Sequence, residues 1–211
     1  MSGTVVAFHT TDPLYRAEAE RMRRSADRLG ISTDVEQIAA SSWLDAVRSK
    51  VGFLMRKRAT TSGPMLYVDV DAIFHADPWP LLENMEADAS FPLLLDGKAR
   101  SGTIYLADTA GAREFLADWQ RRLTAAPEAW DQHPLNAIAE EADSLPYAWT
   151  NLPGALCFIF DRAEATVGPG VTPVIEHLQA SRDLTSVGSA KQKRRQDRIR
   201  EIDQLLGSGS E

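Results

Sequence analysis

The feature that most constrains this chain is the alternation of short apolar segments with longer amphipathic ones. Residues 4–8 and 65–70 are apolar runs with the length and composition of buried strands. Between them, residues 13–29 and 43–54 repeat apolar side chains at spacings of three and four, which is typical of helices packed on one face. Such alternation predicts an α/β fold, in which helices cover both faces of a sheet.

The helix boundaries carry recognisable end signals. Asp12 and Pro13 form a typical N-cap and first helical residue, and Gly30 is a typical stop. Ser42 is expected to open the second helix, and Asp108 or Thr109 a later one. Further strands are predicted at 31–38, 89–95, 102–106, 147–152, 157–160 and 173–175, and short helices at 80–85 and 134–141.

The C-terminal part of the chain differs in character. Residues 190–206 form a charged helix with few apolar positions, and 207–211 read GSGSE, a flexible tail. We therefore divide the chain into a catalytic domain over 1–183, a basic helical segment over 184–206 and a tail over 207–211.

Charge is distributed unevenly around the net value of −7. Residues 59–181 hold 6 basic and 18 acidic side chains, whereas 13–58 hold 10 and 6, and 182–200 hold 7 and 2. An acidic centre between basic stretches favours a cation site flanked by surfaces suited to phosphates. Solvated helix faces would give the same counts.

The chain shows no signal for a membrane or for secretion. No stretch approaches 18 consecutive apolar residues, and the first residues lack a basic region followed by an apolar run. The single cysteine, Cys157, lies in the apolar run LCFIF. We expect a cytoplasmic protein with no membrane partner and a buried thiol.

Two carboxylates end the apolar segment that starts at Met65. In an extended chain Asp69 and Asp71 project to the same side, where they would repel each other. A divalent cation with a preference for oxygen ligands would relieve that repulsion. In the alternative interpretation these acids only end the strand and cap the turn before Pro78.

The segment LYVDVDAIFHADP resembles the Asp-x-Asp segment of GT-A-type nucleotide-sugar glycosyltransferases. Other pieces that resemble this family follow in order: RSGTIYL, FLADW with the later WDQ, LPYAWTNLP and PVIEHLQASR. FHTTDPLYRAEAERMRRSADRLG and SSWLDAVRSK resemble the opening of small bacterial and phage members. The resemblance spans about residues 4–183, although the chain is short and lacks the lysine-rich C-terminal motif of the glycogenin-like branch.

The resemblance implies a GT-A-like, Rossmann-type mixed sheet flanked by helices. It also implies a metal site of Asp69, Asp71 and His177. Asp69 would lie nearer the ribose and Asp71 nearer the ion. A shell of oxygen and nitrogen ligands favours Mn²⁺ over Ca²⁺, with Mg²⁺ as the other candidate. The alternative for His177 is a satisfied histidine of the core.

The donor and catalytic residues follow from the same resemblance and from position. Tyr15 could stack on the base or belong to the core, and Arg182 is the expected diphosphate contact. Arg100 and Asp131 are the catalytic candidates. Asp131 would orient the sugar, stabilise positive charge at its anomeric carbon or act as a base. In the alternative interpretation Asp131 only caps the helix at Pro134. The full expected donor set is Thr10, Thr11, Tyr15, Lys50, Asp69, Ser101, Gly102, Gln132, Ser181 and Arg182.

The predicted activity is metal-dependent transfer of a hexosyl group from a nucleotide-diphosphate sugar, with uridine diphosphate expected, to a hydroxyl. Phage relatives glycosylate hydroxymethylated pyrimidines in DNA, so DNA in a host cytoplasm is one acceptor candidate, supported by the basic stretches and opposed by the net charge. A saccharide or a small molecule is the competing acceptor.

Three other classes fit less well. Haloacid dehalogenase-type phosphatases have Gly-Thr after the acidic pair, where this chain has Ala72 and Ile73. Sugar-nucleotide-forming nucleotidyltransferases have a glycine-rich basic loop after the first strand, where this chain has the sequence HTTD. A non-catalytic nucleotide- or nucleic-acid-binding module stays open, and Mn²⁺-dependent donor hydrolysis would separate it from an enzyme.

Overall fold

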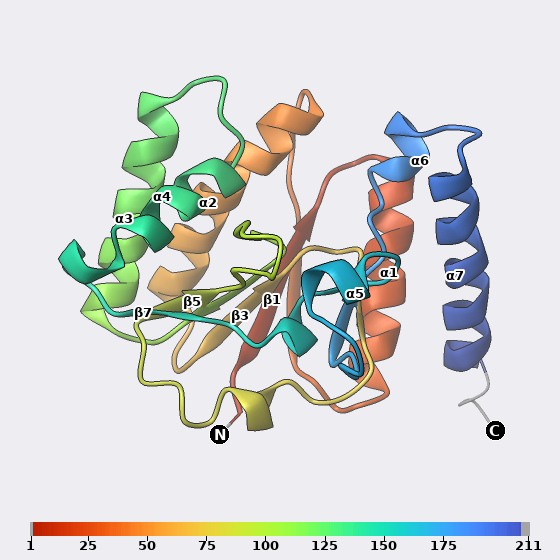
Figure 1. Ribbon diagram of the computed structural model, residues 1–211, viewed down its shortest axis with the longest axis horizontal. Coiled ribbons are helices and arrows are strands. Elements are labelled where there is room, and N and C mark those ends of the chain that lie inside the picture. Colours follow the sequence, from red (N-terminus) through yellow and green to blue (C-terminus); the bar gives the residue numbers. More distant parts are fainter. Residues whose placement is uncertain (1, 208–211) are drawn as a thin grey trace.

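A mixed six-stranded sheet forms the centre of the computed structural model, which describes residues 2–207 (Figure 1). Its strand order is β2-β1-β3-β6-β5-β7. Strand β1 is parallel to β2 and β3, while β6 runs antiparallel to both of its neighbours, β3 and β5. The bounds are β1 Thr4–His9, β2 Thr33–Gln37, β3 Met65–Val68, β5 Ala89–Phe91, β6 Thr103–Leu106 and β7 Trp149–Asn151. The predicted mixed α/β sheet is confirmed.

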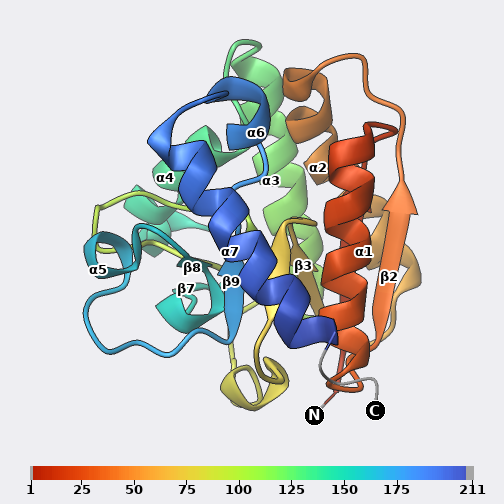
Figure 2. The same cartoon turned by 90° about the vertical axis from the view of Figure 1, so that its right-hand side faces the viewer.

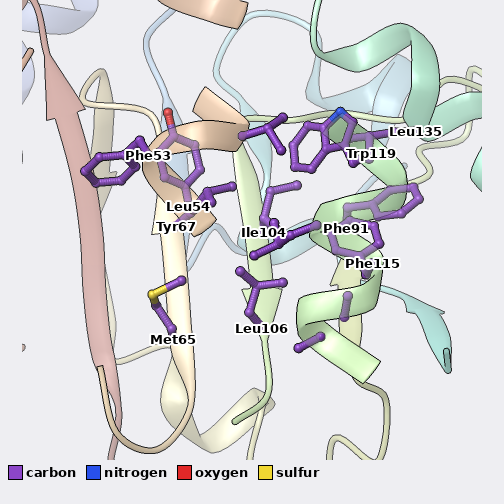
Figure 3. Close-up of a cluster of buried hydrophobic side chains, with 14 of the residues drawn as sticks. Phe53, Leu54, Met65, Tyr67, Phe91, Ile104, Leu106, Phe115, Trp119 and Leu135 are labelled. Atoms are coloured by element: carbon purple, nitrogen blue, oxygen red, sulfur yellow. The ribbon is translucent and has the colours of Figure 1, made fainter. Parts of the chain in front are cut away.

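Helices cover both faces of this sheet, as alternation along its strands requires. Met65 and Tyr67 of β3 point into a cluster built with α2 (Trp43–Thr60) and α3 (Ala110–Ala125), shown in Figure 3. Leu66 and Val68 point the other way, into a cluster built with α1 (Pro13–Asp27). Among residues 2–207, no helix has the length and apolar character needed to cross a bilayer.

The sequence correctly located the starts of the long helices. The carboxylate of Asp12 accepts a hydrogen bond from the Leu14 N–H at 2.8 Å, and the Ser42 hydroxyl accepts one from the Asp45 N–H at 3.1 Å. Helix α3 is capped by Thr109 and not by Asp108. Each cap satisfies a backbone donor that the first turn leaves free, which fixes where the helix begins.

A second, three-stranded sheet has the order β4-β9-β8, and its bounds are β4 Ala72–Phe74, β8 Phe158–Ile159 and β9 Ile175–His177. The chain crosses from the large sheet to this one between Val68 and Ala72. The prediction of one strand over 65–70 is therefore wrong, because the Ala72 N–H donates to the Asp69 carbonyl and closes a turn. Asp69 and Asp71 flank that turn instead of alternating along a single strand.

Other elements are shorter than the sequence indicated. Strand β5 stops at Phe91 because Pro92 has no N–H to donate to a neighbouring strand. The predicted helix over 80–85 is a 3₁₀ turn, η1 (Trp79–Leu81), followed by a turn in which the Met85 N–H donates to the Leu82 carbonyl. The remaining elements are α4 (Gln132–Glu140), η2 (Ala142–Ser144), η3 (Gly154–Leu156), α5 (Ala163–Thr166) and α6 (Arg182–Thr185).

The C-terminal helix α7 (Ala190–Gly207) lies across α1 and the small sheet (Figure 2). Ile202 and Leu206 pack on Ile73 of β4, and Arg198 forms an ion pair with Glu176 of β9 at 2.8 Å. Gly207, placed in the tail by the sequence, is the last residue of this helix, and residues 208–211 lie outside the described part of the chain.

Arg195 of α7 is completely buried. Its guanidinium pairs with Glu18 of α1, itself 1% exposed, and with Asp183 of α6. Burial raises the pKa of Glu18, and Arg195 opposes that rise. The predicted basic segment thus uses at least one of its charges inside the protein.

We predict that Arg195→Met destabilises the fold by about 3–5 kcal/mol, because it leaves the buried Glu18 carboxylate without its main partner. The melting temperature should fall by about 10 °C in a thermal scan. Lys193→Met, on the exposed side of the same helix, is the control and should change stability by less than about 0.5 kcal/mol. Equal melting temperatures for the two variants would contradict the assigned role.

Candidate active site

A cavity of about 870 Å³ lies at the carboxyl ends of β1 and β3, where ligands of open α/β sheets gather. It brings together nearly all of the side chains that the sequence singled out. The predicted residues that line it are Thr10, Thr11, Tyr15, Lys50, Asp69, Asp71, Arg100, Ser101, Gly102, Asp131, Gln132, His177 and Ser181.

Lys50 of α2 is the ionic centre of the cavity, and only 3% of it is exposed. Its Nζ lies 2.6 Å from Asp131 Oδ2 and 3.1 Å from Asp69 Oδ1. It also donates to the carbonyl and hydroxyl oxygens of Ser101, both at 3.1 Å. Burial lowers the pKa of Lys50, but Asp131 and Asp69 outweigh burial and hold that pKa well above its usual range. The lysine therefore stays charged.

Asp131 stands at the N-cap position of α4, yet its carboxylate makes no capping bond there. The alternative in which it only caps that helix is wrong. Its side chain is 4% exposed and faces Lys50, while its carbonyl accepts a hydrogen bond from Trp119 Nε1 at 2.7 Å. Lys50 thus holds the carboxylate inside the cavity, and Trp119 fixes the backbone that carries it.

His177 of β9 is fixed by a chain of contacts. The Thr103 hydroxyl donates to the Leu156 carbonyl at 2.7 Å, so it accepts from His177 Nε2, which lies 2.9 Å away. This turns Nδ1 toward Asp71 Oδ1, at 3.4 Å. Burial lowers the pKa of His177, but the Cys157 sulfur and the Asp71 carboxylate raise it to about 10.

Asp71 and Asp69 are each anchored by backbone or side-chain donors. The Ala180 N–H donates to Asp71 Oδ2 at 2.8 Å, and the Tyr67 hydroxyl donates to Asp69 Oδ1 at 2.6 Å. Gly102 lies between the side chains of Asp69 and His177. A Cβ at this position would lie 3.3 Å from Asp69 Oδ2 and 3.1 Å from His177 Cε1. Glycine is needed for this close approach.

The electrostatics around these carboxylates favour a cation. Burial raises the pKa of Tyr15 to about 12, and the carboxylates of Asp71, Asp69 and Asp12 add to the rise. Two carboxylates and an imidazole are suitable ligands for Mn²⁺ or Mg²⁺. Within residues 2–207, no three His, Cys, Asp or Glu side chains are already gathered into a metal-binding group. The donor chemistry fits such an ion, and the ligands would have to close around it.

Arg182 is the predicted donor residue that the structure keeps away from the cavity lining. Its guanidinium forms an ion pair with Asp161 at 2.6 Å and lies over the Phe160 ring. The Asp161 carboxylate and the Phe160 ring hold the Arg182 side chain outside the cavity lining, where the sequence analysis did not expect it. Arg100 does line the cavity, where it pairs with Asp96.

Several lining residues escaped the sequence analysis. Gln179 adopts φ 57°, an uncommon conformation for a residue other than glycine, next to the turn that holds Asp71. Cys157 is 2% exposed, as predicted, but it also borders the cavity. Trp43, which belongs to the apolar repeat predicted over 43–54, is 46% exposed. No spacing signal in the sequence would have found Gln179, since it depends on a loop conformation.

Residues 54–186, more than half of the chain, match the family model described as nucleotide-diphospho-sugar transferase. The chain belongs to this family. The transferase has no significant sequence similarity to any curated protein.

Solved glycosyltransferases share the fold of this transferase. One involved in glycosylating the major capsid of PBCV-1 is 11% identical, with a TM-score of 0.62 over 93% of this chain and 98% of its own. The galactosyltransferase LgtC, solved with donor and acceptor sugar analogues, is 12% identical, with a TM-score of 0.57 over 99% and 96%. Mouse xyloside xylosyltransferase 1 is 10% identical, with a TM-score of 0.54 over 84% and 97%. The fold is thus GT-A, and the protein is a glycosyltransferase.

We predict that Gly102→Ala lowers donor turnover by about ten- to a hundredfold, because the new Cβ pushes Asp69 and His177 apart by a few tenths of an ångström. The melting temperature should stay within a few degrees of wild type. Gly52→Ala is the matched control, since a Cβ there meets nothing within 4 Å. Loss of stability without loss of turnover in the folded fraction would show that Gly102 serves only the strand.

Proposed function

We propose that this glycosyltransferase moves a hexosyl group from a uridine-diphosphate sugar to an acceptor hydroxyl with the aid of Mn²⁺ or Mg²⁺. The observation that carries the proposal is the convergence of Asp69, Asp71 and His177 in one cavity with the Lys50–Asp131 ion pair. Such a cavity offers ligands for a cation on one side and a fixed carboxylate on the other.

Asp71 and His177, with Asp69, are the residues that would hold the ion. The Thr103 contact supports this assignment, because a hydroxyl that fixes one nitrogen of a histidine ring orients the other nitrogen toward a metal. When bound, the ion would offset the negative charge that grows on the departing diphosphate. The negative field that Tyr15 experiences from both carboxylates supports the same placement.

In the transfer, the bond from the anomeric carbon to the diphosphate oxygen breaks, a bond to the acceptor oxygen forms, and the acceptor hydroxyl loses its proton. Lys50 holds the Asp131 carboxylate in place inside the cavity. A fixed carboxylate can bind sugar hydroxyls, stabilise positive charge at the anomeric carbon or, in an inverting reaction, accept that proton. Ser101 and Gly102 would lie beside the sugar, Arg100 at the cavity edge, and Thr10, Thr11 and Tyr15 beside the nucleotide.

A saccharide is the acceptor we favour over DNA. The DNA hypothesis relied on three basic stretches, at 16–28, 48–58 and 191–200. In the last of these, Arg195 is buried on Glu18, and Arg194 and Arg198 pair with Asp161 and Glu176. Phosphate binding needs cations that are free to pair. LgtC, which shares this fold, was solved with an analogue of an acceptor sugar. A hydroxymethylated pyrimidine in DNA remains an acceptor to be assayed beside saccharides.

We predict that Asp71→Asn lowers Mn²⁺-dependent hydrolysis of a uridine-diphosphate sugar by about a hundredfold or more, because loss of one carboxylate weakens the hold on the ion. Calorimetry should show weaker Mn²⁺ binding by the same variant. Asp143→Asn, exposed and away from the cavity, is the control and should behave like wild type. Wild-type turnover by Asp71→Asn in chelator-treated buffer would refute the metal assignment.

A further inference from the structure

Two large aromatic side chains stand exposed at the cavity. Trp43, at the start of α2, and Trp130, just before α4, are each 46% exposed, and both line the cavity. Their ring centroids are 5.5 Å apart at 74°, an edge-to-face pair, and the His133 ring lies 5.2 Å from Trp130. Exposed aromatic surface gathered in a cavity is informative because most side chains of this size are buried.

This aromatic pair is held rigidly. Arg48, on the same helix as Trp43, donates to the carbonyls of Leu123, Ala126 and Ala129 at 2.8, 3.1 and 2.7 Å. These bonds tie the loop between α3 and α4 to the first turns of α2, and Figure 1 shows the two segments side by side. The backbone segments that carry the two tryptophans are therefore tied together before a ligand arrives, which lowers the entropic cost of binding.

The pair also lies next to the reacting end of the cavity. Trp43 precedes Lys50 by seven residues, two helical turns, which amounts to about 10.5 Å along the axis of α2. Trp130 directly precedes Asp131, whose carboxylate contacts Lys50. The proposed nucleotide site uses Thr10, Thr11 and Tyr15. The two tryptophans are therefore available to bind another reactant.

We propose that Trp43 and Trp130 form the acceptor subsite of this enzyme and that its ligand is a saccharide whose pyranose ring stacks on them. The apolar C–H face of such a ring complements the negative face of an indole. His133 and the lining hydroxyls of Ser41 and Ser42 offer polar partners for its hydroxyl groups. This inference depends on the proposed function, because it names the acceptor class of the same site.

Charge beside the pair favours a neutral sugar over a nucleic acid. A phosphodiester backbone needs free cations, but Arg48 uses its guanidinium on backbone carbonyls. Two residues beyond Trp43, Asp45 adds a carboxylate, which accepts hydrogen bonds from Ser41. A ring without charge meets no repulsion there.

The direct test uses the five tryptophans as probes in ¹H–¹⁵N NMR of the full chain, with indole signals assigned by single Trp→Phe variants. Lactose, maltose and cellobiose should shift the signals of Trp43 and Trp130. Trp79 and Trp119, which are 6% and 0% exposed, are internal controls and should not move. The proposal is overturned if none of the three saccharides shifts the exposed pair, or if a single-stranded DNA oligonucleotide does so in their place.

Kinetics separate the subsite from the donor site. Trp43→Ala and Trp130→Ala should each raise the KM for the saccharide acceptor by about tenfold, with the KM for the donor close to wild type. Trp130→Phe should restore most of the acceptor affinity, and Met55→Ala, 40% exposed on the same helix but outside the cavity, should change neither KM. A rise in the donor KM would overturn the assignment.

Failure of the proposed function would look different. Wild-type protein that hydrolyses no uridine-diphosphate sugar with Mn²⁺ would refute the donor and metal assignment. The NMR titration needs no turnover, so it would still decide whether the aromatic pair binds saccharides.

Discussion

The ammonium group of Lys50 lies where four segments of the chain meet. It links α2 to Asp69 after β3, to Ser101 before β6 and to Asp131 at the start of α4. Without it, a carboxylate that is 4% exposed would lack its counter-charge, at a cost of about 3–5 kcal/mol. The same ion pairs thus stabilise the fold and line the candidate active site, so the candidate catalytic carboxylate is also a structural one.

The turn between the two sheets gives the site its shape. Because the chain leaves β3 at Asp69 and enters β4 after Asp71, one carboxylate faces Lys50 and the other faces His177. The small sheet that carries His177 is supported from behind by α7, through the pair of Arg198 with Glu176. Helix α7, which contributes no residue to the cavity lining, therefore supports the strand that carries a candidate ligand.

The shared fold at 10–12% identity has a physical basis. A buried strand accepts any apolar side chain of suitable size, so the alternation of β3 between its two clusters survives wide substitution. A functional site has no such tolerance, because its activity depends on the position and chemistry of specific side-chain atoms. This is why the present chain keeps the GT-A fold at so low an identity.

The sequence by itself determined the α/β alternation, the caps at Asp12 and Ser42, the family and a set of site residues of which all but Arg182 line the cavity. These follow from local periodicity and from short motifs. Only the tertiary structure decided that Asp131 pairs with Lys50, that Arg182 is bound to Asp161 and that Thr103 orients His177. Those contacts join residues 21 to 81 positions apart, and no local pattern records which distant partner a charged or polar side chain will meet once the sheets have formed.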